Sequence, residues 1–134
     1  MIQEFDHVGL VVKNTEETAK TLMSLFGFKI TEQETFEAQG FKSTLISKGK
    51  VTIELIEPLG DKGIIQNHIR KNGYGLHHIS LRVDDIENEM SSLKEKGARL
   101  LNESPERITA ETRIAFIHPH SAGGVLVELM ERIP

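Results

Sequence analysis

Two histidines and two glutamates recur at matching places in the sequence, and their side chains could bind a metal ion. His7 is followed 71 residues later by His78, and Glu54 is followed 74 residues later by Glu128. Imidazole nitrogens and carboxylate oxygens are ligands of divalent transition metals such as Co, Zn, Ni, Mn and Fe. On an octahedral ion, four such ligands leave positions for water or a bidentate substrate, which suits Lewis-acid catalysis. The residue types therefore suggest a catalytic metal site.

The four residues belong to an internal repeat. Residues 5–14 (FDHVGLVVKN) align with residues 76–85 (LHHISLRVDD), and residues 51–57 (VTIELIE) align with residues 125–131 (VLVELME). In each half, an Asn or Asp of the helix-capping type then precedes a helical pattern. This order predicts two βαβββ modules in a single domain, residues 1–134. The expected parts are module one at about 1–60, a linker helix at about 61–74 and module two at about 75–134.

The other strands of the two modules follow from alternating patterns. They are predicted over residues 29–34 and 41–47 in the first half, and over residues 99–102 and 112–117 in the second. The predicted fold class is α+β, in which two βαβββ modules related by pseudo-twofold symmetry form a curved mixed sheet around a metal cleft.

Alternation along the strands separates the four polar residues from an apolar set. The apolar set, which we expect to face the helices, is Val8, Leu10, Val12, Val51, Ile53, Leu55, Ile79, Leu81, Val83, Val125, Val127 and Leu129. His7, Glu54, His78 and Glu128 lie on the strand faces opposite to this apolar set. His77, next to His78, shares the apolar face instead, and we expect it to be structural. The alternative is that repeat symmetry places four solvated polar residues at matching positions without a metal.

The composition narrows the possible partners. The formal charge is -4 and the chain has no long block of like charge, so we expect no nucleic acid partner. No apolar run approaches the roughly 18 residues of a membrane span. The chain has no cysteine, which excludes disulfides and a cysteine nucleophile. We expect no signal peptide and no membrane association, and hence a cytoplasmic protein.

Several stretches resemble the vicinal oxygen chelate superfamily, and within it the methylmalonyl-CoA epimerase family. They are residues 6–14 (DHVGLVVKN), 53–59 (IELIEPL), 75–79 (GLHHI), 114–121 (IAFIHPHS) and 124–129 (GVLVEL). The resemblance covers nearly the whole chain and implies the glyoxalase fold of paired βαβββ modules. It also implies metal ligation by His7, His78 and Glu128, with the fourth ligand at position 54, where some members carry Gln.

The resemblance implies an acyl-CoA or related thioester substrate of the 2-methylmalonyl type. The implied reaction is a 1,1-proton transfer through a metal-stabilised enolate, with Glu128 as one base. In some members a glutamate early in the third strand is the second base, and the aligned place here is near Lys42, with Ser43 beside it. Lys42 is therefore the second catalytic candidate, and Glu37 is a conceivable substitute. Because similar proteins are often dimers, we expect a homodimer.

Other functions stay open at this point. A glyoxalase I-type lyase or isomerase would use the same fold, and a ring-cleaving dioxygenase is less favoured because Glu54 adds a second carboxylate. The missing second base favours a non-catalytic ligand-binding or resistance module. Arg82 shares the face of His78 and could contact an anionic substrate. The segment 109–112 lacks the glycines of similar epimerases, so we expect a differently shaped loop.

Overall fold

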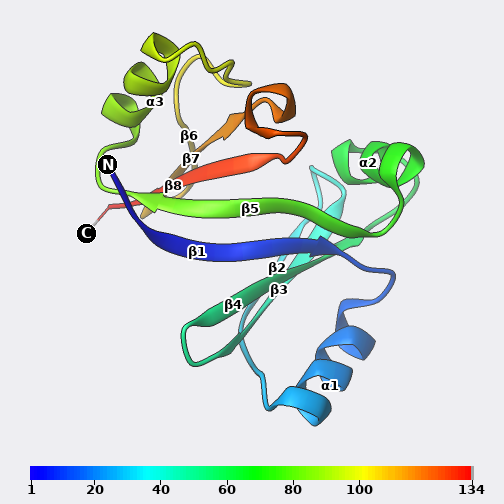
Figure 1. Cartoon of the computed structure of the whole chain (residues 1–134). Coiled ribbons are helices and arrows are strands. Elements are labelled where there is room, and N and C mark those ends of the chain that lie inside the picture. Colours follow the sequence, from blue (N-terminus) through cyan, green and yellow to red (C-terminus); the bar gives the residue numbers. More distant parts are fainter. Residues whose placement is uncertain (134) are drawn as a thin grey trace. The chain divides into compact units, whose positions relative to one another are not determined.

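The structure is a computed structural model that describes residues 1–133 (Figure 1). The order of elements is β1 (Ile2–Val11), α1 (Thr15–Phe26), β2 (Lys29–Phe36), β3 (Phe41–Lys48), β4 (Val51–Pro58), α2 (Ile64–Asn72), β5 (Gly75–Val83), α3 (Ile86–Glu95), β6 (Glu106–Thr109), β7 (Thr112–Ile117), the short 3-10 helix η1 (Pro119–Ala122) and β8 (Val127–Arg132). The βαβββ order therefore occurs twice, with α2 between the two copies, as the repeat predicts.

The chain divides into two compact units. The N-terminal unit is residues 7–77, and the C-terminal unit is residues 1–6 together with residues 78–134. Strand β1 begins in the C-terminal unit and ends in the N-terminal unit. The strand order is β2-β3-β4-β1 in one unit and β5-β8-β7-β6 in the other.

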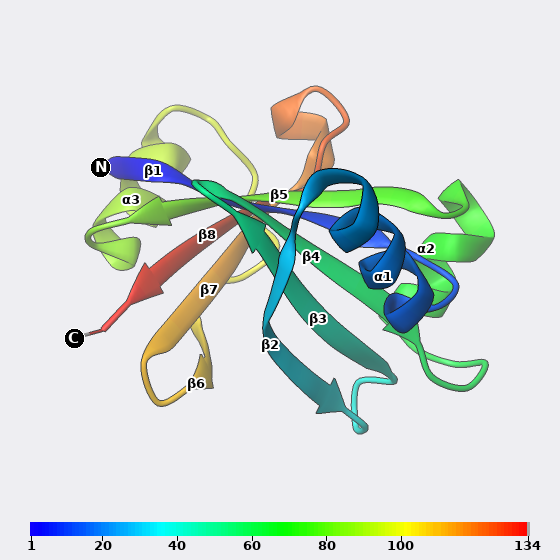
Figure 2. The ribbon, with the colours of Figure 1, turned by 90° about the horizontal axis from the view of Figure 1, so that it is seen from below.

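Helix α1 of the N-terminal unit begins and ends at residues that suit those positions. The Asn14 side chain accepts a hydrogen bond from the Glu17 amide at 2.9 Å and so caps the first turn. Gly27 has a φ of 78°, a left-handed conformation that glycine adopts without steric cost, and it ends the helix. Figure 2 shows α1 beside the strands of its unit.

The core under α1 contains four of the six apolar residues predicted for the first module, whereas Val51 is 54% exposed. It consists of Ala19, Ile46 and Leu55, packed with Leu10, Val12, Leu22, Phe28 and Ile53. A second cluster, which the alternation analysis did not predict, lies on the other face of the strands. It is formed by Val11, Ile56 and Ile65, with Phe41 and Ile69. Helix α2 therefore packs on the sheet face opposite to α1.

The C-terminal unit repeats the arrangement of strands. β5 is parallel to β8, and β7 is antiparallel to both β8 and β6. Helix α3 begins after Asp85, whose side chain accepts a hydrogen bond from the Asn88 amide. The core here is Val83, Ile86, Met90, Ala115, Ile117, Val127 and Leu129, packed with Ile79, Leu81, Leu93, Leu100, Ala122 and Val125. The apolar face predicted for the second module is confirmed.

One predicted strand, residues 99–102, is wrong. Leu100 forms only an isolated bridge with Ile117, and the Asn102 side chain accepts the Phe116 amide at 2.8 Å. That contact replaces a backbone ladder bond, so the pairing stops there. The second strand of this module is instead β6, at Glu106–Thr109, which pairs with β7 in a hairpin. The glycine-free segment 109–112 forms the end of this hairpin (Figure 2).

Among residues 1–133, no helix is both long enough and apolar enough to cross a membrane.

Candidate functional site

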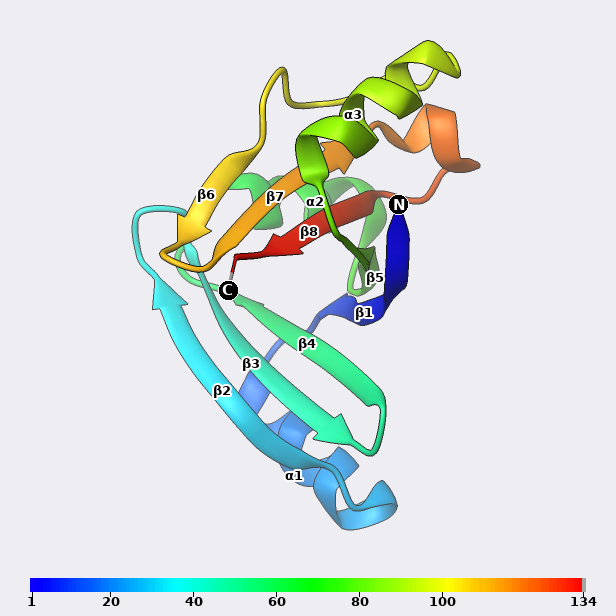
Figure 3. The same ribbon diagram turned by 90° about the vertical axis from the view of Figure 1, so that its left-hand side faces the viewer.

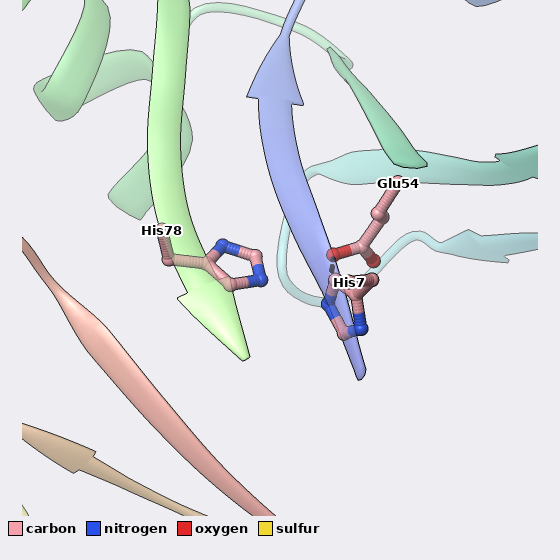
Figure 4. A group of neighbouring side chains, drawn as sticks. All are labelled: His7, Glu54 and His78. Carbon is pink, nitrogen blue, oxygen red and sulfur yellow. Dashed lines mark ion pairs between the residues drawn. The ribbon is translucent and has the colours of Figure 1, made fainter. Parts of the chain in front are cut away.

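In the N-terminal unit, His7 and Glu54 lie against each other. His7 is 5% exposed, and its Nε2 atom is 3.4 Å from Glu54 Oε1. The parallel register of β1 and β4 pairs Gly9 with Glu54, so His7, two residues earlier, shares the face of that glutamate. Figure 4 shows the two side chains extending toward each other from their strands.

Ser43 on β3 holds the other oxygen of this carboxylate. Its buried hydroxyl donates a hydrogen bond of 2.7 Å to Glu54 Oε2. The antiparallel register pairs Leu45 with Glu54, so Ser43, two residues from Leu45, faces the same side. Ser43 was expected only as a neighbour of the candidate Lys42, and the alternation of side chains along β3 is the signal that separates the two residues.

Lys42 lies on the opposite face of β3. Its Nζ atom is 3.7 Å from Glu57 Oε2, and Glu57 Oε1 accepts the Thr15 amide at 2.7 Å at the start of α1. Lys42 is thus on the side of the sheet that α1 covers, whereas Ser43 faces Glu54. The acid or base role of Lys42 stays a prediction, as does that of Glu37, which is exposed in the turn after β2.

In the C-terminal unit, His78 and Glu128 are both buried, at 3% and 6% exposure. The parallel register of β5 and β8 pairs Ser80 with Glu128, so His78 and Glu128 share a face. The His78 ring stands edge-on to Phe116, with 6.3 Å between ring centroids.

The two His and Glu pairs have the same strand register. In each module the glutamate of the fourth strand pairs with the residue two positions after the histidine of the first strand. The repeat seen in the sequence therefore extends to the strand pairing that positions these side chains. Within each unit, one imidazole and one carboxylate therefore lie on the same face of the strands of that unit.

Two other residues named from the sequence have structural partners. Arg82 donates a hydrogen bond of 2.8 Å to Asp6 and forms an ion pair with Glu4 at 2.8 Å, so its guanidinium is already engaged by two carboxylates. The His77 ring packs against that of His68 with 4.6 Å between centroids. This contact agrees with the structural role expected of His77.

Comparison with known proteins identifies the fold and the family of this chain. Residues 6–116 match the family model described as the Glyoxalase/Bleomycin resistance protein/Dioxygenase superfamily. The mitochondrial methylmalonyl-CoA epimerase of Dictyostelium discoideum is 33% identical over 132 residues, which cover 98% of this chain and 80% of that protein.

Two solved structures match almost the full length of the chain. A hypothetical protein of Bacillus halodurans has a TM-score of 0.91 at 33% identity, covering 98% of this chain and 95% of that one. Methylmalonyl-CoA epimerase of Streptomyces coelicolor, in complex with 2-nitronate-propionyl-CoA, has a TM-score of 0.90 at 27% identity, with both chains fully covered.

The two βαβββ modules and these matches define the class of protein as an α+β protein with the glyoxalase fold. The chain belongs to the Glyoxalase/Bleomycin resistance protein/Dioxygenase superfamily, and within it the chain is most similar to the methylmalonyl-CoA epimerases. The family and the fold class expected from the sequence are confirmed.

Proposed function

We propose that this chain is a metal-dependent epimerase of a 2-methylmalonyl-type acyl-CoA. The proposed ligands of one divalent ion are His7, Glu54, His78 and Glu128. The first three are a group of side chains that could hold a metal ion (Figure 4). The proposal adds Glu128 because its place in the second module matches that of Glu54 in the first.

The donor set fits a divalent transition metal. Two imidazoles and two carboxylates are ligands that Co, Zn, Ni, Mn and Fe accept, and the chain has no thiolate that would close a structural zinc site. Three of the four side chains are at most 6% exposed, so bulk water does not solvate them. Ser43 fixes the orientation of the fourth, which is the kind of outer support that metal ligands require.

The reaction requires that a proton leave C2 of the thioester and return on the other face. A bound divalent cation stabilises the negative charge that develops on the thioester oxygen. We assign Glu128 as one of the proton-transfer groups, because it is a buried carboxylate that can accept the C2 proton and give it back.

The substrate class rests on similarity. The Streptomyces coelicolor epimerase is in complex with an acyl-CoA compound, and its structure superposes on this chain over its whole length. We infer that this chain takes an acyl-CoA thioester too. The homodimer and the cytoplasmic location expected from the sequence stay predictions.

The matching register of the two His and Glu pairs is the observation that most supports this proposal. The test is incubation of the metal-loaded chain with each epimer of methylmalonyl-CoA in D₂O. The expected result is deuterium at C2 together with the opposite epimer. Absence of both products from both epimers would reject the proposed function.

A specific observation favours a second candidate, a non-catalytic binding module. On the face of β3 that contacts Glu54, the side chain is Ser43, not a glutamate. A serine hydroxyl is a poor base, so this strand supplies no second proton-transfer group. A binding module would bind a malonyl thioester and give no product in a single turnover. A glyoxalase-type lyase would instead convert a hemithioacetal.

A further inference from the structure

Inversion at C2 needs two proton-transfer groups, one for each face of the planar enolate. Strand β3 does not supply a carboxylate for the second group. Ser43 donates its hydroxyl to Glu54, and Lys42 lies on the α1 side next to Glu57. The neighbouring strand on this side of the sheet is β2, which carries three glutamate and glutamine residues between positions 32 and 34.

The register of β2 and β3 places a carboxylate directly opposite Ser43. Glu34 is its cross-strand partner, so Glu34, Ser43 and Glu54 project from the same face of the sheet. Cross-strand partners have Cβ atoms about 5 Å apart, which is within reach of a glutamate side chain. Figure 3 shows β2, β3 and β4 side by side in this order.

Glu32 lies on the same face of β2 as Glu34, but the two glutamates have different cross-strand partners on β3. Glu32 pairs with Leu45, and Leu45 pairs with Glu54, so a bulky apolar side chain stands between these two carboxylates. Glu34 instead faces the small Ser43, which pairs with Ile56 on β4 and whose hydroxyl reaches the Glu54 carboxylate. Glu34 is also exposed, so its carboxylate can turn toward a bound ligand.

We propose that Glu34 is the second proton-transfer group of this chain. This inference rests on the proposed function. In each direction one of the two residues, Glu128 or Glu34, acts as a carboxylate and the other as a carboxylic acid. The C2–H bond breaks as an O–H bond forms on the carboxylate. The carboxylic acid on the other residue then gives its proton to the opposite face of C2, so that its O–H bond breaks and a new C2–H bond forms. No oxidant or further reactant is needed.

The test compares Glu34→Gln with Glu32→Gln, the same substitution two residues away on the same face. Each metal-loaded protein is incubated in D₂O with each methylmalonyl-CoA epimer. For Glu34→Gln we expect epimerisation to fall by roughly 10²–10⁴-fold, the usual contribution of a general acid or base. One epimer should still exchange its C2 proton without inversion, because Glu128 acts on that face, and the other epimer should not exchange. Glu32→Gln should keep both reactions.

The two hypotheses fail in different ways. A wild-type chain without exchange or inversion refutes the proposed function, and the role of Glu34 falls with it. An active wild type with a Glu34→Gln variant that epimerises within about threefold, or that loses exchange equally for both epimers, overturns the role of Glu34 alone. The thermal midpoint and the metal content of the variant should equal those of the wild type, and loss of either would also contradict a role in proton transfer only.

Discussion

The hydrogen bond between Ser43 and Glu54 is the most informative single contact in the N-terminal unit. It engages one carboxylate oxygen, Oε2, while Oε1 lies 3.4 Å from His7 Nε2. A carboxylate held in this way has one orientation available for a metal ion.

Residue types and alternation predicted His7 and Glu54 as candidate ligands. The contact with Ser43 depends on which residues of β3 and β4 are paired, and this register cannot be read from the sequence.

We predict that Ser43→Ala weakens metal binding by about 10- to 100-fold, as loss of an outer partner of a metal ligand usually does. The reason is that Glu54 then loses the donor that fixes its orientation. Isothermal titration with Co²⁺ measures the affinity directly.

Ser47→Ala is the matched control for this variant. Ser47 lies on the same strand and face but contacts Thr52, with 2.9 Å between the hydroxyl oxygens. The affinity of the Ser47→Ala variant for Co²⁺ should equal that of the wild type. Equal affinities for Ser43→Ala and the wild type would show that this hydrogen bond does not support a metal ligand.

A pH dependence of stability is expected from His68 on α2. Burial lowers the pKa of His68 from its usual 6.5, although a hydrogen bond to the Leu76 backbone acts in the opposite direction. The unfolded chain therefore takes up a proton at this residue at higher pH than the folded chain does. Stability should decrease as the pH falls below about 6.5 toward the lower folded pKa, and should be unaffected by this residue at higher pH.

Urea unfolding of the wild type and of His68→Gln between pH 5 and pH 7.5 measures this effect. The variant should lose less of its stability on acidification than the wild type does. Identical pH slopes for the two proteins would exclude a contribution from His68.

At the scale of elements, each module ties its helix to its fourth strand through a glutamate. Glu57 accepts the first amide of α1, and Glu131 accepts the Ile86 amide at the start of α3 at 2.8 Å. A carboxylate at a helix N-terminus satisfies an otherwise unpaired amide and interacts favourably with the helix dipole. The two glutamates occupy matching positions of the repeat, so the capping contact is repeated as well.

We predict that Glu131→Gln lowers the free energy of unfolding by about 1–3 kcal/mol, because Glu131 is buried and both of its oxygens are bonded. Its second partner, Arg113, keeps a contact of 2.6 Å to Glu87. Glu87→Gln is the control, and as an exposed ion pair it should cost less than about 1 kcal/mol. Equal losses in urea unfolding for the two variants would contradict a capping role for Glu131.

Element boundaries were predictable where pattern and capping residues agree, as for α1 after Asn14 and α3 after Asp85. The prediction failed at residues 99–102, which were expected to form the second strand of the second module. There a side-chain contact from Asn102 to the Phe116 amide replaces strand pairing, and the strand forms later, at β6. Such a substitution of one hydrogen-bond partner for another has no signature in hydrophobic alternation.

At the scale of the whole molecule, the resemblance of several sequence stretches predicted the family to which the chain belongs. The internal repeat predicted the βαβββ order of both modules. It did not predict how the chain is divided into compact units. The chain passes from one unit to the other between residues 6 and 7, and again between residues 77 and 78. His7 and His78, the two proposed imidazole ligands, are the first residues after these crossings.

The metal content of the purified chain after loading with Co²⁺ and desalting tests the central claim most directly, since every proposed role depends on a shared ion. We predict one ion per wild-type chain, and loss of that ion in both His7→Ala and His78→Ala, because each histidine is a ligand of the same metal. A wild-type chain that retains no metal, or variants that retain as much as the wild type, would contradict the account.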